Sequence, residues 1–101
     1  MAGRAKINIP HNEIEDFCKK HHILKLALFG SVLRDDFRPD SDVDVLVEFE
    51  ENHLPGYIKL AGIELELGEI LGRKVDMNTP ECLSRYFRDE VIATAEIEYA
   101  Q

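Results

Sequence analysis

Three short segments of the chain have the polarity pattern of β-strands. Residues 24–29 form an almost continuous apolar run that stops at Gly30, as expected for a buried strand. Residues 42–49 alternate in polarity, with Val43, Val45, Val47 and Phe49 on one face and Asp42, Asp44, Leu46 and Glu48 on the other. Residues 74–78 alternate in the same way, so that Asp76 points away from Val75 and Met77.

Helical periodicity is found before the first of these strands and between the second and third. Pro10 suits the first turn of a helix, which carries an apolar stripe at Ile14, Phe17 and Cys18 and should end near His21 or His22. A second helix ends at Gly72, and its apolar stripe consists of Leu60, Ile63, Leu67, Ile70 and Leu71.

Two further helices are predicted from their first residues. Ser31 can cap a short helix over residues 32–36. Thr79 and Pro80 suit the N-cap and first position of a last helix. Its expected core face is Leu83, Phe87, Val91 and Ala95.

The order of elements predicts a single α/β domain over residues 1–101, in which helices cover about three core strands and residues 1–9 form a loose lead-in. The net charge of −8 argues against a general nucleic-acid binder. The two cysteines, Cys18 and Cys82, lack metal-type spacing, and we expect both to be reduced and partly buried. Neither a signal peptide nor a membrane-spanning run is recognisable, so we expect a cytoplasmic protein without a membrane partner.

The aspartates carry the first chemical signal. Asp42 and Asp44 lie two residues apart on one strand face and therefore repel each other, a conflict that a divalent cation such as Mg²⁺ would relieve. If the strand of Asp76 lies near by, three carboxylates converge. Such a cluster could share two metal ions with a nucleoside triphosphate and support an in-line displacement at phosphorus. Solvated acids at strand ends are the alternative for each residue alone.

The second signal is the strand-to-helix turn at Gly30 and Ser31. Glycine allows close backbone approach, and free N–H groups at a helix start suit a phosphate. Arg34 lies one helical turn further on and could reach the same group, although a single surface arginine is more often only solvated.

The spacing of these signals resembles the minimal nucleotidyltransferase family of the polymerase-β-like superfamily. Gly30-Ser31 is followed by Asp42-x-Asp44, and Gly72-Arg73-Lys74-Val75-Asp76 resembles the family's third-carboxylate strand. The resemblance covers residues 12–98. It implies a nucleotidyltransferase fold, Asp42, Asp44 and Asp76 as ligands of two Mg²⁺ (or Mn²⁺) ions, Asp76 as base, and ATP held by Gly30, Ser31, Arg34 and Ser41. One departure is Asp35, where the family often has glycine.

Small members of this family act beside a HEPN ribonuclease toxin, so the resemblance implies an antitoxin that transfers AMP to a tyrosine of such a partner. The acidic chain has no basic groove and ends one helix after Asp76, so we expect another molecule to supply the acceptor. It could act alone with its partner or as a homodimer. The alternatives are a non-catalytic antitoxin that neutralises by contact, and nucleotidylation of a small molecule.

Two other sequence features resemble metal-binding motifs but lack an essential part of them. Asp40-x-Asp42-x-Asp44 imitates a calcium loop, but Val45 occupies the place that requires glycine. His21, His22 and His53 have no ligand-like spacing, and we expect them to be surface residues.

Overall fold

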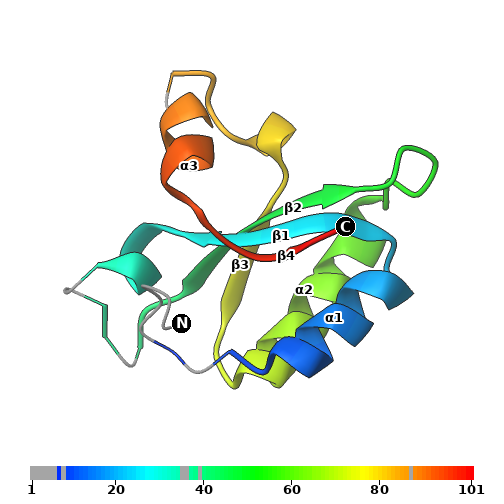
Figure 1. Ribbon diagram of the computed structural model, residues 1–101, viewed down its shortest axis with the longest axis horizontal. Coiled ribbons are helices and arrows are strands. Elements are labelled where there is room, and N and C mark those ends of the chain that lie inside the picture. Colours follow the sequence, from blue (N-terminus) through cyan, green and yellow to red (C-terminus); the bar gives the residue numbers. More distant parts are fainter. Residues whose placement is uncertain (1–6, 8, 35–36, 39, 87) are drawn as a thin grey trace.

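A computed structural model describes residues 7, 9–34, 37–38, 40–86 and 88–101 of the chain. Within this described part, four strands form one mixed sheet in the order β3-β2-β1-β4 (Figure 1). The central strands β1 (Ile23–Phe29) and β2 (Val43–Phe49) are antiparallel. β3 (Val75–Asn78) pairs parallel to β2, and β4 (Glu96–Ala100) pairs antiparallel to β1.

Two helices, α1 (His11–Lys20) and α2 (Tyr57–Leu71), lie together on one side of the sheet (Figure 1). The short helix α3 (Arg88–Thr94) and the 3₁₀ turn η2 (Pro80–Cys82) lie on the other side. The helix α2 ends as predicted, because Gly72 adopts a left-handed backbone with φ of 68°. No described helix is both long and apolar enough to cross a membrane.

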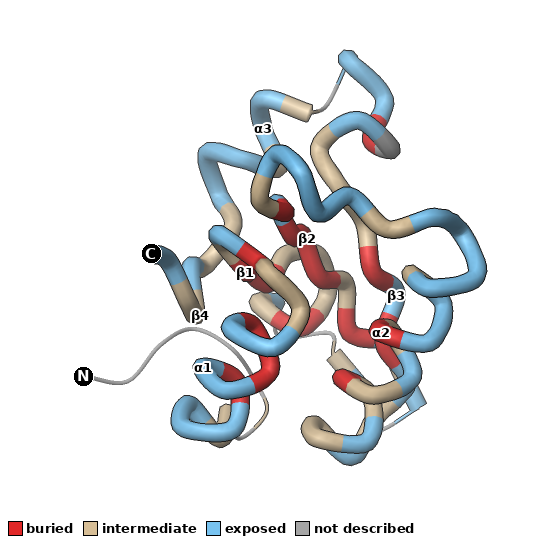
Figure 2. The backbone as a smooth tube through the Cα atoms, turned by 90° about the vertical axis from the view of Figure 1, so that its right-hand side faces the viewer, coloured by how far each residue is buried: buried red, intermediate tan, exposed pale blue. Residues whose placement is uncertain are grey.

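The core lies between the sheet and the pair α1–α2, where Figure 2 shows the buried residues gathered on the strands and the inner helix faces. The alternation in β2 is confirmed, since its four apolar residues at odd positions are buried in this layer. Cys18 is buried and free, in agreement with its expected reduced state. Ile7 and Ile9 of the predicted lead-in pack against the core. The core consists of Ile14, Phe17, Cys18, Ile23, Leu26, Leu28, Val32, Val43, Val45, Val47, Phe49, Ile63, Leu67, Val75 and Met77.

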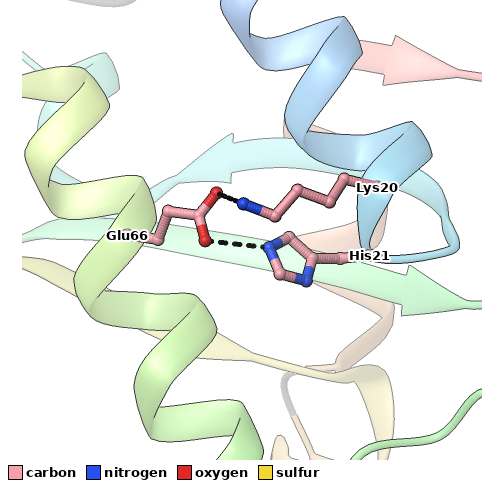
Figure 3. Close-up of polar contacts among 3 residues, drawn as sticks. All are labelled: Lys20, His21 and Glu66. Atoms are coloured by element: carbon pink, nitrogen blue, oxygen red, sulfur yellow. Dashed lines mark hydrogen bonds and ion pairs between the residues drawn. The ribbon is translucent and has the colours of Figure 1, made fainter.

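A polar contact joins the end of α1 to the middle of α2 (Figure 3). Glu66 accepts from Lys20 Nζ at 2.9 Å and lies 3.1 Å from His21 Nε2. The imidazole of His21 also meets the ring of Phe17 edge-on, and its side chain is only 13% exposed. The expectation that His21 is a surface residue is therefore wrong, because its ring closes the gap between two helices.

The predicted last helix is wrong in extent. The segment after Thr79 forms the short turn η2, then α3, and then strand β4. Pro80 does take the first position of a helical turn, but Ala95 lies beyond α3, and α3 has no buried residue among those described. Phe87 lies outside the described residues. The alternating sequence Glu-Ile-Glu-Tyr pairs with the free edge of β1, and this pairing prevails over helical continuation.

The short helix after β1 also differs from its prediction. It is a 3₁₀ turn, η1 (Gly30–Leu33), that begins at Gly30 with Phe29 as its cap and without a side-chain cap bond. Ser31 therefore lies within the first turn instead of capping it. Residues 35 and 36, including Asp35, lie outside the described part of the chain.

Candidate functional site

The parallel pairing of β2 and β3 brings two of the predicted carboxylates together. Asp44 is the direct register partner of Asp76, on strands that run about 4.8 Å apart. Their neighbours Val43 and Val75 pair in the same register and are buried under α1 and α2. Asp44 and Asp76 therefore project from the opposite face of the sheet, where Asp76 is exposed and Asp44 is half-buried.

Asp42 completes a cluster of three acids. It precedes β2 by one residue and is exposed. Partial burial raises the pKa of Asp44, and the negative charges of Asp76 and Asp42 raise that pKa further. Asp44 is thus close enough to both other carboxylates to be repelled by each of them.

Gly30 is the residue that makes room for Asp44. Its backbone has a φ of 77°, and the antiparallel pairing of Phe29 with Asp44 sets the turn against that carboxylate. A Cβ atom on Gly30 would overlap Oδ2 of Asp44 and lie 3.2 Å from its Cγ. Glycine is therefore required here by both the left-handed backbone and the close approach of a site residue.

The remaining predicted residues surround the cluster in different ways. Ser31 stands half-buried in η1, directly after Gly30. The charge of Arg34 lowers the pKa of Asp44, so its guanidinium lies within electrostatic range of the acids. The Ser41 hydroxyl accepts the Arg38 backbone N–H at 3.1 Å and so shapes the loop that leads to Asp42.

A cleft of about 770 Å³ opens beside Asp42, between the start of α1, the end of α2 and the loop before β2. It reaches Asp42 and Ser41, whereas Asp44 and Asp76 are not among its lining residues. Arg73 and Lys74 add positive charge to its wall, and Ile70 and Leu71 add an apolar surface. A ligand held at the carboxylates could extend past Asp42 into this cleft.

The chemistry of the three acids fits a divalent cation. They are oxygen donors at neighbouring positions of β2 and β3 and the residue before β2. Partial burial raises the pKa of Asp44, and the charges of Asp76 and Asp42 raise it further, which is the conflict that a bound cation removes. Asp42, Asp44 and Asp76 are therefore the residues that would hold a metal ion.

Sequence reasoning missed one residue beside this site. Glu64 of α2 accepts the backbone N–H of Met77 at 2.7 Å, next to Asp76 in the chain. This bond holds β3 against α2 and fixes the strand that carries the third acid. A single glutamate on a helix gives no sequence signal for this role.

A second polar cluster, His22, Glu50 and His53, was also missed. Their potential ligand atoms all lie within 4.8 Å of one another. His22 is half-buried and His53 is exposed, in line with the expected surface positions, but both side chains lie beside Glu50 and their rings stack on each other. The grouping depends on the pairing of β1 with β2, which brings residue 22 beside residue 50.

Known proteins share this fold and much of this sequence. The sequence model of the nucleotidyltransferase domain family matches residues 11–99 of this chain. A Methanocaldococcus jannaschii protein, provisionally named a protein adenylyltransferase, is 38% identical over 80 residues, which cover 71% of this chain and 80% of that protein.

Two solved structures extend the comparison. A provisionally assigned minimal nucleotidyltransferase is 33% identical, with a TM-score of 0.69 and coverage of 84% of this chain and 85% of its own. A complex of the tri-AMPylated Shewanella oneidensis HEPN toxin with its MNT antitoxin gives a TM-score of 0.66 at 18% identity, covering 90% of this chain and 70% of that one. At that identity the likeness concerns the fold alone.

The chain belongs to the nucleotidyltransferase domain family. It is a nucleotidyltransferase enzyme that is similar in sequence and fold to the minimal nucleotidyltransferase described above.

Proposed function

We propose that this chain is the antitoxin of a HEPN ribonuclease toxin and that it transfers AMP from ATP to a hydroxyl of that toxin, a tyrosine in the first instance. The observation that carries the proposal is the register pairing of Asp44 with Asp76, with Asp42 in electrostatic range. The adenylyltransferase name of the M. jannaschii relative and the AMPylated toxin in the Shewanella complex support the choice of donor and acceptor.

In this proposal Asp42, Asp44 and Asp76 hold Mg²⁺, which would offset the charge of the triphosphate and of the attacking and leaving oxygens. The Gly30–Ser31 turn donates backbone N–H groups and the Ser31 hydroxyl to phosphate oxygens. Arg34 stands near enough to the acids to meet a phosphate there. Ser41 acts on the loop before Asp42 and could also reach a nucleotide in the adjoining cleft.

Asp76 is the proposed base, because it is the most open of the paired acids. It is exposed, whereas its partner Asp44 is half-buried. It would take the proton of the acceptor hydroxyl as that oxygen bonds to the α-phosphorus of ATP. The bond from the α-phosphorus to the bridging oxygen then breaks, and pyrophosphate leaves. The products are an AMP ester of the acceptor and pyrophosphate, so atoms and charges balance.

The test is the intact mass of a purified HEPN partner after incubation with this protein, ATP and Mg²⁺. The proposal expects the partner to gain one or more AMP units with the wild type and none with Asp44→Asn. An unchanged mass combined with full neutralisation of the toxin would contradict it and would leave an antitoxin that acts by contact. AMP found on a small molecule instead would move the acceptor to that class.

A further inference from the structure

We propose that His22, Glu50 and His53 form a second metal site, which takes a transition-metal ion of the Zn²⁺ type and is separate from the aspartate cluster. The two imidazoles and the carboxylate supply three donors from segments that the sheet brings together. This inference does not rest on the proposed function, because it concerns the other end of β2.

The backbone holds the three residues in place. His22 directly precedes β1, and its carbonyl accepts the N–H of Glu50 at 2.8 Å, just after the end of β2. The carbonyl of Glu50 in turn accepts the N–H of His53 at 2.9 Å. The donors are therefore grouped by the fold before any ion binds.

Glu50 lies within ion-pair distance of both histidines, but neither contact is a close hydrogen bond. Glu50 Oε2 lies 3.7 Å from His22 Nδ1, and Glu50 Oε1 lies 3.8 Å from His53 Nδ1. Both distances exceed the 2.7–3.2 Å range of a hydrogen bond. Donor atoms of a tetrahedral zinc site lie about 3.3 Å apart. The three donor atoms lie within 4.8 Å of one another, so they must draw together, with rotation of one ring, to share an ion.

The two imidazole rings are stacked, with centroids 3.7 Å apart and planes inclined by 14°. An imidazole nitrogen binds a metal ion in the plane of its ring, so one of the two stacked rings must turn about its side-chain bonds when an ion binds. Both Nδ1 atoms lie on the side of Glu50, within 4 Å of its carboxylate oxygens.

The backbone of His22 adds an independent observation. It has a φ of 57° directly after helix α1, at a position where glycine is the favoured residue. A histidine in this conformation has a less favourable backbone energy than glycine would have. Its side chain places an imidazole ring beside Glu50. Backbone strain of this kind is typical of functional positions.

The donor set distinguishes this site from the first. Imidazole ligands suit Zn²⁺, Co²⁺ and Ni²⁺, whereas a cluster of carboxylates suits Mg²⁺ and Mn²⁺. The two sites lie at opposite ends of β2, about 20 Å apart along the strand. The side-chain amide nitrogen of Gln101 faces Glu50 Oε2 at 3.5 Å and can orient that carboxylate, and water could complete the coordination.

A bound ion would tie together the end of α1, the loop after β2 and the end of β4, since Gln101 N–H also bonds to the Leu24 carbonyl. The same loop leads to the exposed apolar side chains of Leu54, Tyr57 and Ile58. We therefore assign the site a structural role in holding this loop.

The test is a calorimetric titration of the tag-free protein with Zn²⁺ in excess Mg²⁺. It uses the Cys82→Ser background, which removes a competing thiol. His22→Gly is the informative variant, because glycine removes the ring and relieves the backbone at once, so the fold is retained. His53→Ala removes the second ring. His11→Gln is the matched control, since His11 is an exposed histidine that pairs with Glu98 elsewhere.

The proposal expects one equivalent of Zn²⁺ to bind to the background protein and to the His11→Gln control, and Asp44→Asn to leave that binding unchanged. Both His22→Gly and His53→Ala should weaken it by at least about tenfold. Co²⁺ should show the intense visible bands of a tetrahedral site only when both histidines are present. Equal Zn²⁺ affinity in His22→Gly and in the control, or no binding to the background protein, would overturn the proposal.

Discussion

At the scale of single residues, Gly30 and Asp44 depend on each other. The Gly30→Ala change forces a Cβ atom into the Asp44 carboxylate and into an unfavourable backbone, so we expect a loss of about 1–3 kcal/mol of stability. In an Asp44→Ala background the overlapping oxygen is gone, and the same change should cost less. Chemical denaturation of the four proteins measures the coupling. An equal cost in both backgrounds would show that the carboxylate does not fill this space.

Asp44 also gives a pH-dependent prediction for the metal-free protein. Its folded pKa is raised above the ordinary value of an aspartate, chiefly by burial, so over the range between the two values the folded state binds more protons than the unfolded state. Asp44 therefore lowers stability as pH rises through the window between its unfolded and folded pKa. We expect Asp44→Asn to match or exceed the wild type at pH 7 by up to about 1 kcal/mol, with the gap closing toward pH 4. Melts in EDTA at both pH values test this, and a strongly destabilised variant at pH 7 would contradict it.

The thiol of Cys18 should be chemically inert. Burial raises its pKa to about 12, so almost no thiolate is present at neutral pH. In a Cys82→Ser background, a thiol reagent should label no cysteine in the native state and one after denaturation. Rapid labelling of the native protein would mean that the α1 face opens to solvent.

At the scale of elements, Glu66 links α1 to α2 through Lys20 and His21 (Figure 3). The hydrogen bond from Lys20 is the main cause that lowers the Glu66 pKa, and His21 adds to it. This contribution is present above the unfolded value of 4.5 and is lost as pH falls through the lowered pKa. Glu66→Gln should thus cost less than about 1 kcal/mol at pH 7, because solvent screens a side chain that is 34% exposed.

Denaturation of wild type and Glu66→Gln at pH 7 and at pH 3 checks this expectation. The difference in unfolding free energy should shrink at pH 3. Glu15→Gln is a matched control, since its pair with Lys19 lies within α1 and joins no second element. A pH-independent difference would mean that Glu66 acts through packing instead of charge.

Sequence periodicity predicts the first three strands well and the end of the chain poorly. Strands β1, β2 and β3 were placed to within one residue, because each is a buried strand with a sharp polarity pattern. Helical spacing predicts one helix at the end of the chain, and this prediction is wrong. Ile97 and Tyr99 alternate with acidic residues, as the residues of a strand do. Helical spacing from Leu83 to Ala95 suggested continuity, and only the free edge of β1 decides between the two.

At the scale of the whole molecule, strand order determines which distant residues meet. The pairs Asp44–Asp76 and Phe29–Asp44 follow from the order β3-β2-β1 and assemble the acids beside the Gly30 turn. Residue spacing indicated the members of this candidate site but not the steric reason for Gly30, since the contact of Gly30 with Asp44 depends on the sheet register. The cluster of His22, Glu50 and His53 could not be predicted from residue spacing either, because it also depends on how the strands pair.

The most direct test of the account compares two properties of Asp76→Asn and Asp44→Asn, namely affinity for ATP with Mg²⁺ and the rate of AMP transfer to a HEPN partner. If Asp76 is the base, Asp76→Asn should abolish transfer while weakening ATP binding less than Asp44→Asn does, because it removes a role specific to the transition state. Measurable transfer at near wild-type rate by Asp76→Asn, or by Asp44→Asn, would contradict the claim that these paired aspartates carry the reaction.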